Sequence, residues 1–194
     1  MILDEIVAWK RLEVEARKAE TPRCHLEKRI TCRARRPFAE RLRCPAGLAL
    51  LAEIKRASPS AGTIRETVDV PLLAASMEKA GAHALSVLTD AKYFRGSLAD
   101  MTAARKAASI PVLQKDFVID PYQVYEAAAE GADAVLLILR ILSDAELTAL
   151  MGEAGSLGLD CLFEVHSEND LGRALDAGAR LVGRARAARH RRTA

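Results

Sequence analysis

The stretch Gly131-Ala-Asp-Ala-Val-Leu-Leu-Ile-Leu139 decides the fold of this chain of 194 residues. From Ala134 to Leu139 every residue is apolar, with no alternation between polar and apolar positions. Such uninterrupted short runs are typical of strands that are buried on both faces of a parallel sheet. Five further runs of mainly apolar character occur at Leu48–Ile54, Ala84–Leu88, Pro111–Leu113, Asp160–Phe163 and Arg180–Val182.

The segments between these runs carry the signals of helices, so that each run with its following segment reads as a βα unit. Asp120-Pro121 places a capping residue before a proline at the first helical position. Ser143 and Glu146 have the spacing of a capping box. Three glycines stand where a helix would end in the left-handed conformation before the next strand, at Gly81, Gly131 and Gly178.

Repeated βα units predict an α/β fold, either a (β/α)8 TIM barrel or a doubly wound sheet. The glycine-rich motifs of nucleotide-binding sheets do not occur in the sequence, which favours the barrel. Apolar residues recur at helical spacing over residues 2–20, whereas prolines make residues 21–46 irregular apart from a short helix at Phe38–Arg43. We therefore predict an N-terminal helical extension and lead-in at 1–47, an incomplete barrel of about six βα units at 48–183, and a basic tail at 184–194.

Composition and charge exclude several classes of protein. No apolar run reaches the length of a membrane span, and the N-terminus, Met1-Ile-Leu-Asp-Glu5, is acidic instead of having the basic start of a secretory signal. We expect a cytoplasmic protein without a membrane partner. The net charge of +3 comes from five arginines among the last eleven residues, and the rest of the chain carries −2. The body of the protein therefore gives no reason to expect nucleic-acid binding.

The four cysteines do not predict a metal site. Cys24, Cys32 and Cys44 have spacings that match no common zinc pattern, and Cys161 stands alone in the second half of the chain. Cys24-His25 lacks a second pair of ligands that would complete a zinc site. We expect free thiols at all four positions.

Charged residues stand at the carboxyl ends of alternate predicted strands. Glu53 and Lys55 end the first strand, Lys115 ends the third and Glu164 ends the fifth. In a barrel, alternate strands contribute to one interior layer, and ligands bind at the carboxyl ends. Two carboxylates and two ammonium groups should therefore converge, where a lysine can act as a general acid and a glutamate as a base. Solvated loop positions or purely structural ion pairs are the alternatives.

Five segments, in this order and spacing, resemble indole-3-glycerol-phosphate synthase, and the resemblance extends over roughly residues 1–183. The most specific are Glu53-Ile-Lys-Arg-Ala-Ser-Pro-Ser60 and Lys115-Asp-Phe117. The others are Leu85-Ser-Val-Leu-Thr-Asp90, Tyr93-Phe-Arg-Gly-Ser97 and Glu164-Val-His166. The N-terminal helix also fits, because the family carries an extension before its barrel.

The resemblance implies a carboxy-lyase of tryptophan biosynthesis that closes the indole ring of 1-(2-carboxyphenylamino)-1-deoxyribulose 5-phosphate. It implies that Lys115 is the general acid, that Glu164 is the base of the later dehydration, that Lys55 holds anionic groups, and that Glu53 orients the lysines and the substrate. It further implies that Ser58 lies near the substrate carboxylate and that Phe94 and Phe117 pack on the aromatic ring, although core packing is the alternative for both rings. No metal or organic cofactor is implied.

The resemblance ends after Gly183, where the family continues with two further strands and this chain reads Arg-Ala-Arg-Ala-Ala-Arg-His-Arg-Arg-Thr-Ala194. We therefore expect a C-terminally truncated synthase with weak or no activity, and possible self-association through open barrel edges. Two other hypotheses remain. One is a non-catalytic barrel remnant that acts as a folding or interaction partner. The other is a different phosphate-binding barrel such as phosphoribosylanthranilate isomerase, which Glu53, Lys55 and Lys115-Asp-Phe117 disfavour.

Overall fold

A computed structural model describes residues 2–30, 34–43 and 47–184. Its main sheet has six parallel strands that lie in the order in which they occur along the chain, β1-β4-β5-β6-β7-β8. A doubly wound sheet would reverse this order at its centre, so the observed order confirms the incomplete (β/α)8 barrel. The strands span Leu51–Ile54, Ala84–Leu88, Val112–Lys115, Ala134–Ile138, Asp160–Val165 and Val182–Arg184.

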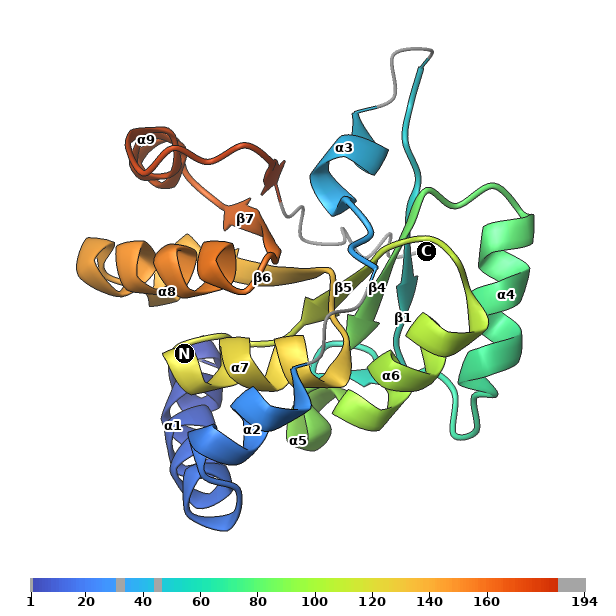
Figure 1. Cartoon of the computed structure of the whole chain (residues 1–194), viewed down its shortest axis with the longest axis horizontal. Helices are drawn as coiled ribbons and strands as arrows, with labels where there is room; N and C mark the ends of the chain where they lie inside the picture. The colour runs from blue at the N-terminus through green and yellow to red at the C-terminus, as the bar shows by residue number, and fades with distance from the viewer. Residues whose placement is uncertain (1, 31–33, 44–46, 185–194) are drawn as a thin grey trace, which may run out of the picture.

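Helices cover the convex side of this curved sheet (Figure 1). They are α4 Val70–Lys79, α6 Leu98–Ala107, α7 Pro121–Glu130, α8 Asp144–Ser156 and α9 Glu168–Asp176. Short elements lie in the connections: the hairpin β2 Ala57–Ser58 and β3 Gly62–Thr63, the helix α5 Ala91–Phe94 and the 3-10 helix η1 Leu139–Ile141. Apart from the predicted short helix, the lead-in was expected to be irregular, and here the prediction is partly wrong, because α2 spans Arg23–Arg29.

The local signals predicted from the sequence are present. Asp120 and Ser143 both form capping boxes, the first with Gln123 and the second with Glu146. Gly131 ends α7 in the left-handed conformation with φ of 97°, which costs glycine little because it has no Cβ. These caps set where each helix starts and ends, and thereby the lengths of the loops at the two ends of the sheet.

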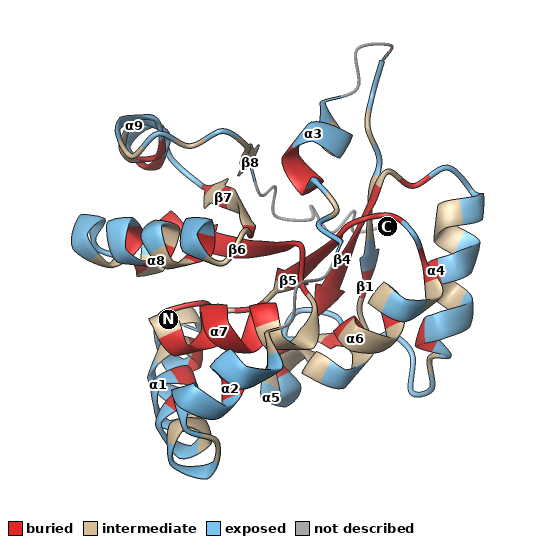
Figure 2. Ribbon diagram, viewed as in Figure 1, coloured by how far each residue is buried: buried red, intermediate tan, exposed pale blue. Residues whose placement is uncertain are grey.

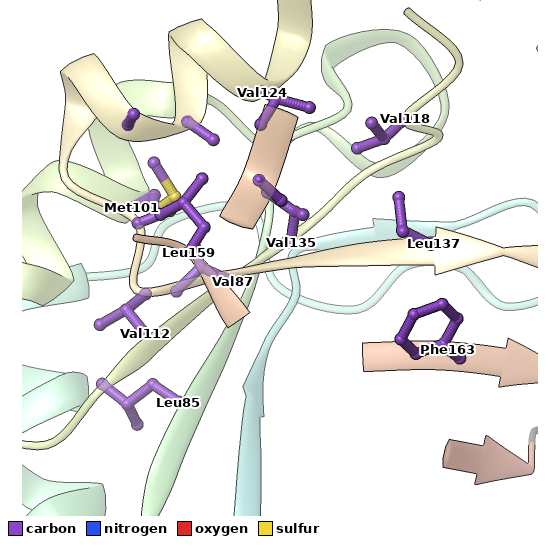
Figure 3. Close-up of a cluster of buried hydrophobic side chains, with 14 of the residues drawn as sticks. Leu85, Val87, Met101, Val112, Val118, Val124, Val135, Leu137, Leu159 and Phe163 are labelled. Carbon is purple, nitrogen blue, oxygen red and sulfur yellow. The ribbon is translucent and has the colours of Figure 1, made fainter. Parts of the chain in front are cut away.

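The main core lies between the convex face of the sheet and the outer helices (Figure 3). Leu85, Val87, Val135 and Leu137 point from the strands into this layer, and Met101 meets them from α6. The central strands β4, β5 and β6 and the inner faces of the helices are accordingly the most buried parts of the chain, whereas β1, β7 and β8 are mostly intermediate (Figure 2). Burial on both faces is the reason for the unbroken apolar runs in the sequence.

A second, smaller core lies on the concave side of the sheet, which is the barrel interior. Phe38 of α3 (Phe38–Leu42) is fully buried there against Leu113, Ala134 and Leu136. The backbone N–H of Ala39 donates to the Asp160 carboxylate at the start of β7, 3.0 Å away. Helix α3 therefore closes the amino end of the barrel interior and leaves the carboxyl end for a ligand.

Helix α1 (Ile2–Glu20) packs beside α7 at the opposite, carboxyl end of the strands (Figure 1). The Tyr122 hydroxyl lies 3.0 Å from the Arg17 carbonyl oxygen and 2.8 Å from that of Thr21. Lys18 Nζ lies 2.7 Å from Asp120 Oδ2. The C-terminal half of α1 is thus joined to α7 by several polar contacts.

Glu126 of α7 is buried beneath α1, with its Oε2 atom 3.4 Å from the guanidinium of Arg17. Burial raises the pKa of Glu126 from 4.5 to about 7, and the nearby carboxylates of Asp116 and Glu13 add to the rise, while Arg17 opposes it. The folded state therefore binds this proton more tightly than the unfolded state. Stability should fall as the pH rises from about 4.5 to about 7.

We expect Glu126→Gln to remove this fall and to be the more stable protein above pH 7, by about 3 kcal/mol at most. Urea unfolding of both proteins at pH 5 and pH 8 measures the difference. Glu168→Gln, at an exposed position of α9, is the matched control and should leave the pH dependence unchanged. Equal pH dependence in the wild type and Glu126→Gln would show that Glu126 is not the titrating group.

Among the described residues, none of the helices combines the length and apolar character needed to cross a bilayer. Cys24 and Cys161 carry free thiols, and Cys32 and Cys44 lie outside the described residues. Within the described part of the chain, no group of His, Cys, Asp and Glu side chains is arranged to hold a metal ion. Of the predicted basic tail, Arg184 ends β8 and the remainder lies outside the described residues.

Candidate active site

Alternate residues of the strands point into the barrel interior and form two layers there. The first, third and fifth strands, β1, β5 and β7, each contribute an apolar residue and, two positions later, a charged one. The intervening strands add smaller or apolar side chains between these layers. The resulting pairs are Leu51 with Glu53, Leu113 with Lys115, and Leu162 with Glu164.

These residues line a cavity of about 220 Å³ at the carboxyl ends of the strands. Ser86 of β4, Leu136 of β6, and Gly183 and Arg184 of β8 complete its wall. Its floor is apolar and its rim is charged, which suits a ligand with an aromatic part and anionic groups.

Lys115 lies between two carboxylates in this cavity. Its Nζ atom is 3.5 Å from Glu164 Oε2 and 3.9 Å from Glu53 Oε2. The Lys115 side chain is 29% exposed, so solvent and a ligand can both reach it. The ammonium group is therefore held in place by charge while it remains available to donate a proton.

Lys55 belongs to the same group of charges, because its Nζ atom lies 2.8 Å from Glu53 Oε1. Glu53 thus contacts both lysines, one with each carboxylate oxygen. The structure brings together all four charged residues that were predicted to converge. The contacts between strands are longer than those of a closed ion pair, which is a geometry that a substrate can enter.

The three predicted substrate-binding residues lie outside the wall of this cavity. Phe94 ends α5 and Phe117 follows β5, and their ring centroids are 6.0 Å apart at an interplanar angle of 43°. Phe117 also packs against the interior core next to the cavity. Ser58 lies in β2, where its hydroxyl accepts a hydrogen bond from the Ala61 N–H at 3.1 Å.

His166, for which the sequence predicted no role, contacts the candidate base. Its Nε2 atom lies 2.9 Å from Glu164 Oε1, so Glu164 has Lys115 on one oxygen and His166 on the other. The spacing of two residues along β7 and its loop was the available signal. Leu136 and Arg184 were also missed as cavity residues, the first because an apolar strand residue reads as core and the second because it was assigned to the tail.

A larger cavity of about 660 Å³ lies between α1 and residues 140–143. Arg11 and Arg140 are in its wall, but none of Glu53, Lys115 and Glu164 is. The smaller cavity is the candidate active site, because general acid and base groups must lie within reach of one substrate.

Comparison with solved structures supports the architecture. Rhizobium etli pyruvate carboxylase aligns with 72% of this chain and 16% of its own, with a TM-score of 0.50 and 16% identity. At this identity the likeness concerns the fold alone.

Sequence comparison is more specific. Residues 3–186 match the family model for indole-3-glycerol phosphate synthase. The indole-3-glycerol phosphate synthase of Desulfosudis oleivorans is 52% identical over 186 residues, which cover 94% of this chain and 71% of that protein. The enzyme of the same name from Beutenbergia cavernae is 45% identical over 183 residues, covering 94% and 68%. With its charged layer at the strand ends and these matches along nearly its whole length, the chain belongs to the indole-3-glycerol phosphate synthase family.

Proposed function

We propose that this chain closes the indole ring of 1-(2-carboxyphenylamino)-1-deoxyribulose 5-phosphate, with the cavity of Glu53, Lys115 and Glu164 as its active site. The observation that carries this proposal is the position of the Lys115 ammonium between two carboxylates at the carboxyl ends of alternate strands. The products are indole-3-glycerol phosphate, carbon dioxide and water.

In the first step, the aromatic carbon that carries the carboxylate attacks the ketone carbon of the ribulose chain. Lys115 donates a proton to the carbonyl oxygen, which becomes a hydroxyl group. The carboxylate then leaves as carbon dioxide, and the electron pair of the broken bond restores the aromatic ring. The Lys115 ammonium group lowers the barrier because it stabilises the negative charge that develops on the carbonyl oxygen.

In the second step, the new hydroxyl group leaves as water. Glu164 takes the proton from the neighbouring carbon, the double bond of the indole forms, and a proton from the ammonium groups accompanies the leaving hydroxyl. His166, 2.9 Å from Glu164, lies where it can hold this carboxylate in position. The acid Lys115 and the base Glu164 thus face the substrate from β5 and β7, which are alternate strands that contribute to the same interior layer.

The remaining residues bind and orient the substrate in this proposal. Lys55 holds anionic groups, and Glu53 orients both lysines through its two oxygens. Ser58 lies near the substrate carboxylate, and Phe94 and Phe117 pack on the aromatic ring. The binding partner in this proposal is a small phosphorylated molecule, and no nucleic acid takes part.

The proposal also includes the cellular location of the chain and its self-association. We place the reaction in the cytoplasm, since the family acts in amino-acid biosynthesis. Strands β1 and β8 lie at the edges of the sheet among the described strands, and their backbone groups support self-association through strand pairing.

Glu164→Gln tests whether Glu164 is the base of the dehydration while Lys115 is the acid of the ring closure. In a single turnover, we expect the variant to release carbon dioxide faster than it forms the indole chromophore, because Glu164 acts in the dehydration. Overall turnover should fall by about 100-fold or more. Glu168→Gln, in the first turn of α9, is the matched control and should behave as the wild type. We expect weak turnover from the wild type, and a wild type that forms no indole product at all from this substrate would refute the proposed function.

A further inference from the structure

Lys10 of α1 is fully buried, which is rare for a lysine and requires compensating charges. Its Nζ atom lies 2.8 Å from Asp90 Oδ2, 2.9 Å from Asp116 Oδ1 and 2.9 Å from Glu13 Oε2. Burial alone lowers the pKa of Lys10, but Asp116 and Asp90 outweigh it and raise the pKa above the ordinary value. The ammonium group is therefore charged and holds three carboxylates together.

Each of the two aspartates accepts a hydrogen bond from the backbone of a segment that carries one of the candidate substrate-binding aromatic rings. Asp90 caps α5 by accepting a hydrogen bond from the Tyr93 N–H at 2.7 Å, and α5 ends at Phe94. Asp116 accepts a hydrogen bond from the Phe117 N–H at 2.8 Å. One ammonium group thus connects the backbone that carries Phe94 with the backbone that carries Phe117.

The same end of α1 makes two more contacts with this connection. Lys92 of α5 stacks over the Trp9 ring, with 3.5 Å between its Nζ atom and the ring centroid. The Tyr93 hydroxyl lies 3.1 Å from Glu5 Oε1. Asp116 is further fixed by the Thr89 hydroxyl, which donates to its Oδ2 atom at 2.6 Å.

Holding α1 on the barrel does not by itself require this cluster. The other half of the helix is attached to α7 through Arg17 and Lys18, at contacts with Glu126 and Asp120. The Lys10 contacts differ because they join α1 to the two connections that follow β4 and β5, at the end of the sheet where the cavity opens. We propose that Lys10 is a positioning residue that sets the relative position of Phe94 and Phe117, on whose paired rings the aromatic ring of the substrate packs.

This inference rests on the proposed function, because the position of the two rings matters for catalysis only if the substrate ring packs on them. In Lys10→Met, the buried carboxylates of Asp90 and Asp116 and the partly buried carboxylate of Glu13 would lose their shared cation, and the segments at 89–97 and 116–118 would separate. We expect KM for the substrate to rise about tenfold or more, while kcat changes by less than about threefold, because Lys115 keeps its contacts with Glu53 and Glu164. Lys10→Arg should recover part of the affinity, since it restores the charge.

Lys18→Met is the matched control, because it also removes an ion pair between α1 and a loop of the barrel. We expect it to leave KM unchanged. Hydrogen exchange provides a readout that does not depend on turnover: amides in 89–97 and 116–118 should exchange about tenfold faster in Lys10→Met and at the wild-type rate in Lys18→Met. Trp9, the single tryptophan, should shift its emission to the red only in Lys10→Met.

Asp90→Asn keeps the test decisive if Lys10→Met does not fold. Asparagine retains the helix cap at Tyr93 but removes one charge from the cluster, so KM should rise about threefold or more with faster exchange at 89–97. Unchanged KM and exchange in Asp90→Asn, or equal rises of KM in Lys10→Met and Lys18→Met, would overturn the proposal. If the wild type has no turnover, the proposed function fails, and the exchange rates alone decide whether Lys10 holds the two segments.

Discussion

Lys115→Met should lower kcat for indole formation by about 100-fold to 10,000-fold, which corresponds to about 3 to 5 kcal/mol in the activation barrier. Methionine keeps the length and most of the volume of the side chain, but it has no proton to donate to the carbonyl oxygen. The variant also leaves Glu53 and Glu164 without the cation that lies between them. Product formation is followed by the absorbance of the indole ring under saturating substrate.

The control for this variant is Lys106→Met, at an exposed position in the last turn of α6. It removes the same charge from the protein without touching the cavity and should retain the wild-type rate. Near-normal turnover in Lys115→Met would remove Lys115 from the acid role. A loss of similar size in Lys106→Met would instead indicate that net charge, and not the site, governs the rate.

Gly96→Ala should destabilise the protein by about 2 to 3 kcal/mol and weaken the site at the same time. A Cβ atom at this position would overlap the carbonyl oxygen of Leu88 and lie 2.6 Å from its carbon. The obstacle is the backbone of β4, which cannot rotate aside as a side chain can. The connection from Asp90 must then move away, and with it the hydrogen bond from the Gly96 N–H to the Asp90 carbonyl, now 2.8 Å long.

Urea unfolding monitored by circular dichroism measures the loss of stability, and KM reports on the displacement of Phe94. Gly152→Ala is the matched control, because a Cβ atom there meets nothing within 4 Å on the outer face of α8. Alanine has the higher helix propensity, so this control should be neutral or more stable by up to about 1 kcal/mol. Equal stability of the two variants would contradict the close approach of Gly96 to β4.

Helix α1, the cavity and the aromatic pair form a continuous polar and aromatic arrangement at the carboxyl end of the sheet. Asp116 connects them, since it follows Lys115 directly and contacts Lys10. Substitutions that break the Lys10 contacts are therefore expected to alter substrate affinity, even though no residue of α1 lines the candidate cavity.

The division of the chain into residues 1–47, 48–183 and 184–194 stays a prediction. Two observations bear on it: Phe38 of α3 packs inside the barrel, and Arg184 lies in β8. Structurally, the lead-in contributes to the barrel core. The chain spans about 70% of the length of the relatives from Desulfosudis oleivorans and Beutenbergia cavernae, and the matched residues include every charged residue of the proposed site.

The sequence by itself determined the six strands of the main sheet, their parallel arrangement and the charged layer of the candidate site, but not the hairpin of β2 and β3. Unbroken apolar runs require burial on both faces, and residues two positions apart on a strand share a face, so the pattern of residues alone places Glu53, Lys115 and Glu164 together. These inferences depend only on local periodicity and on the rule that alternate barrel strands fill one layer.

Only the tertiary structure shows the contacts of Lys10 and Gly96. From the sequence, Lys10 is expected to be exposed to solvent, because lysines on amphipathic helices are rarely buried. Its partners Asp90 and Asp116 are distant in the sequence, and no local pattern predicts these contacts. The same holds for Gly96, whose neighbour is the backbone of β4. Lys10 is buried against the connections that follow β4 and β5, which are distant from it in the sequence. This burial exists only once the barrel has formed.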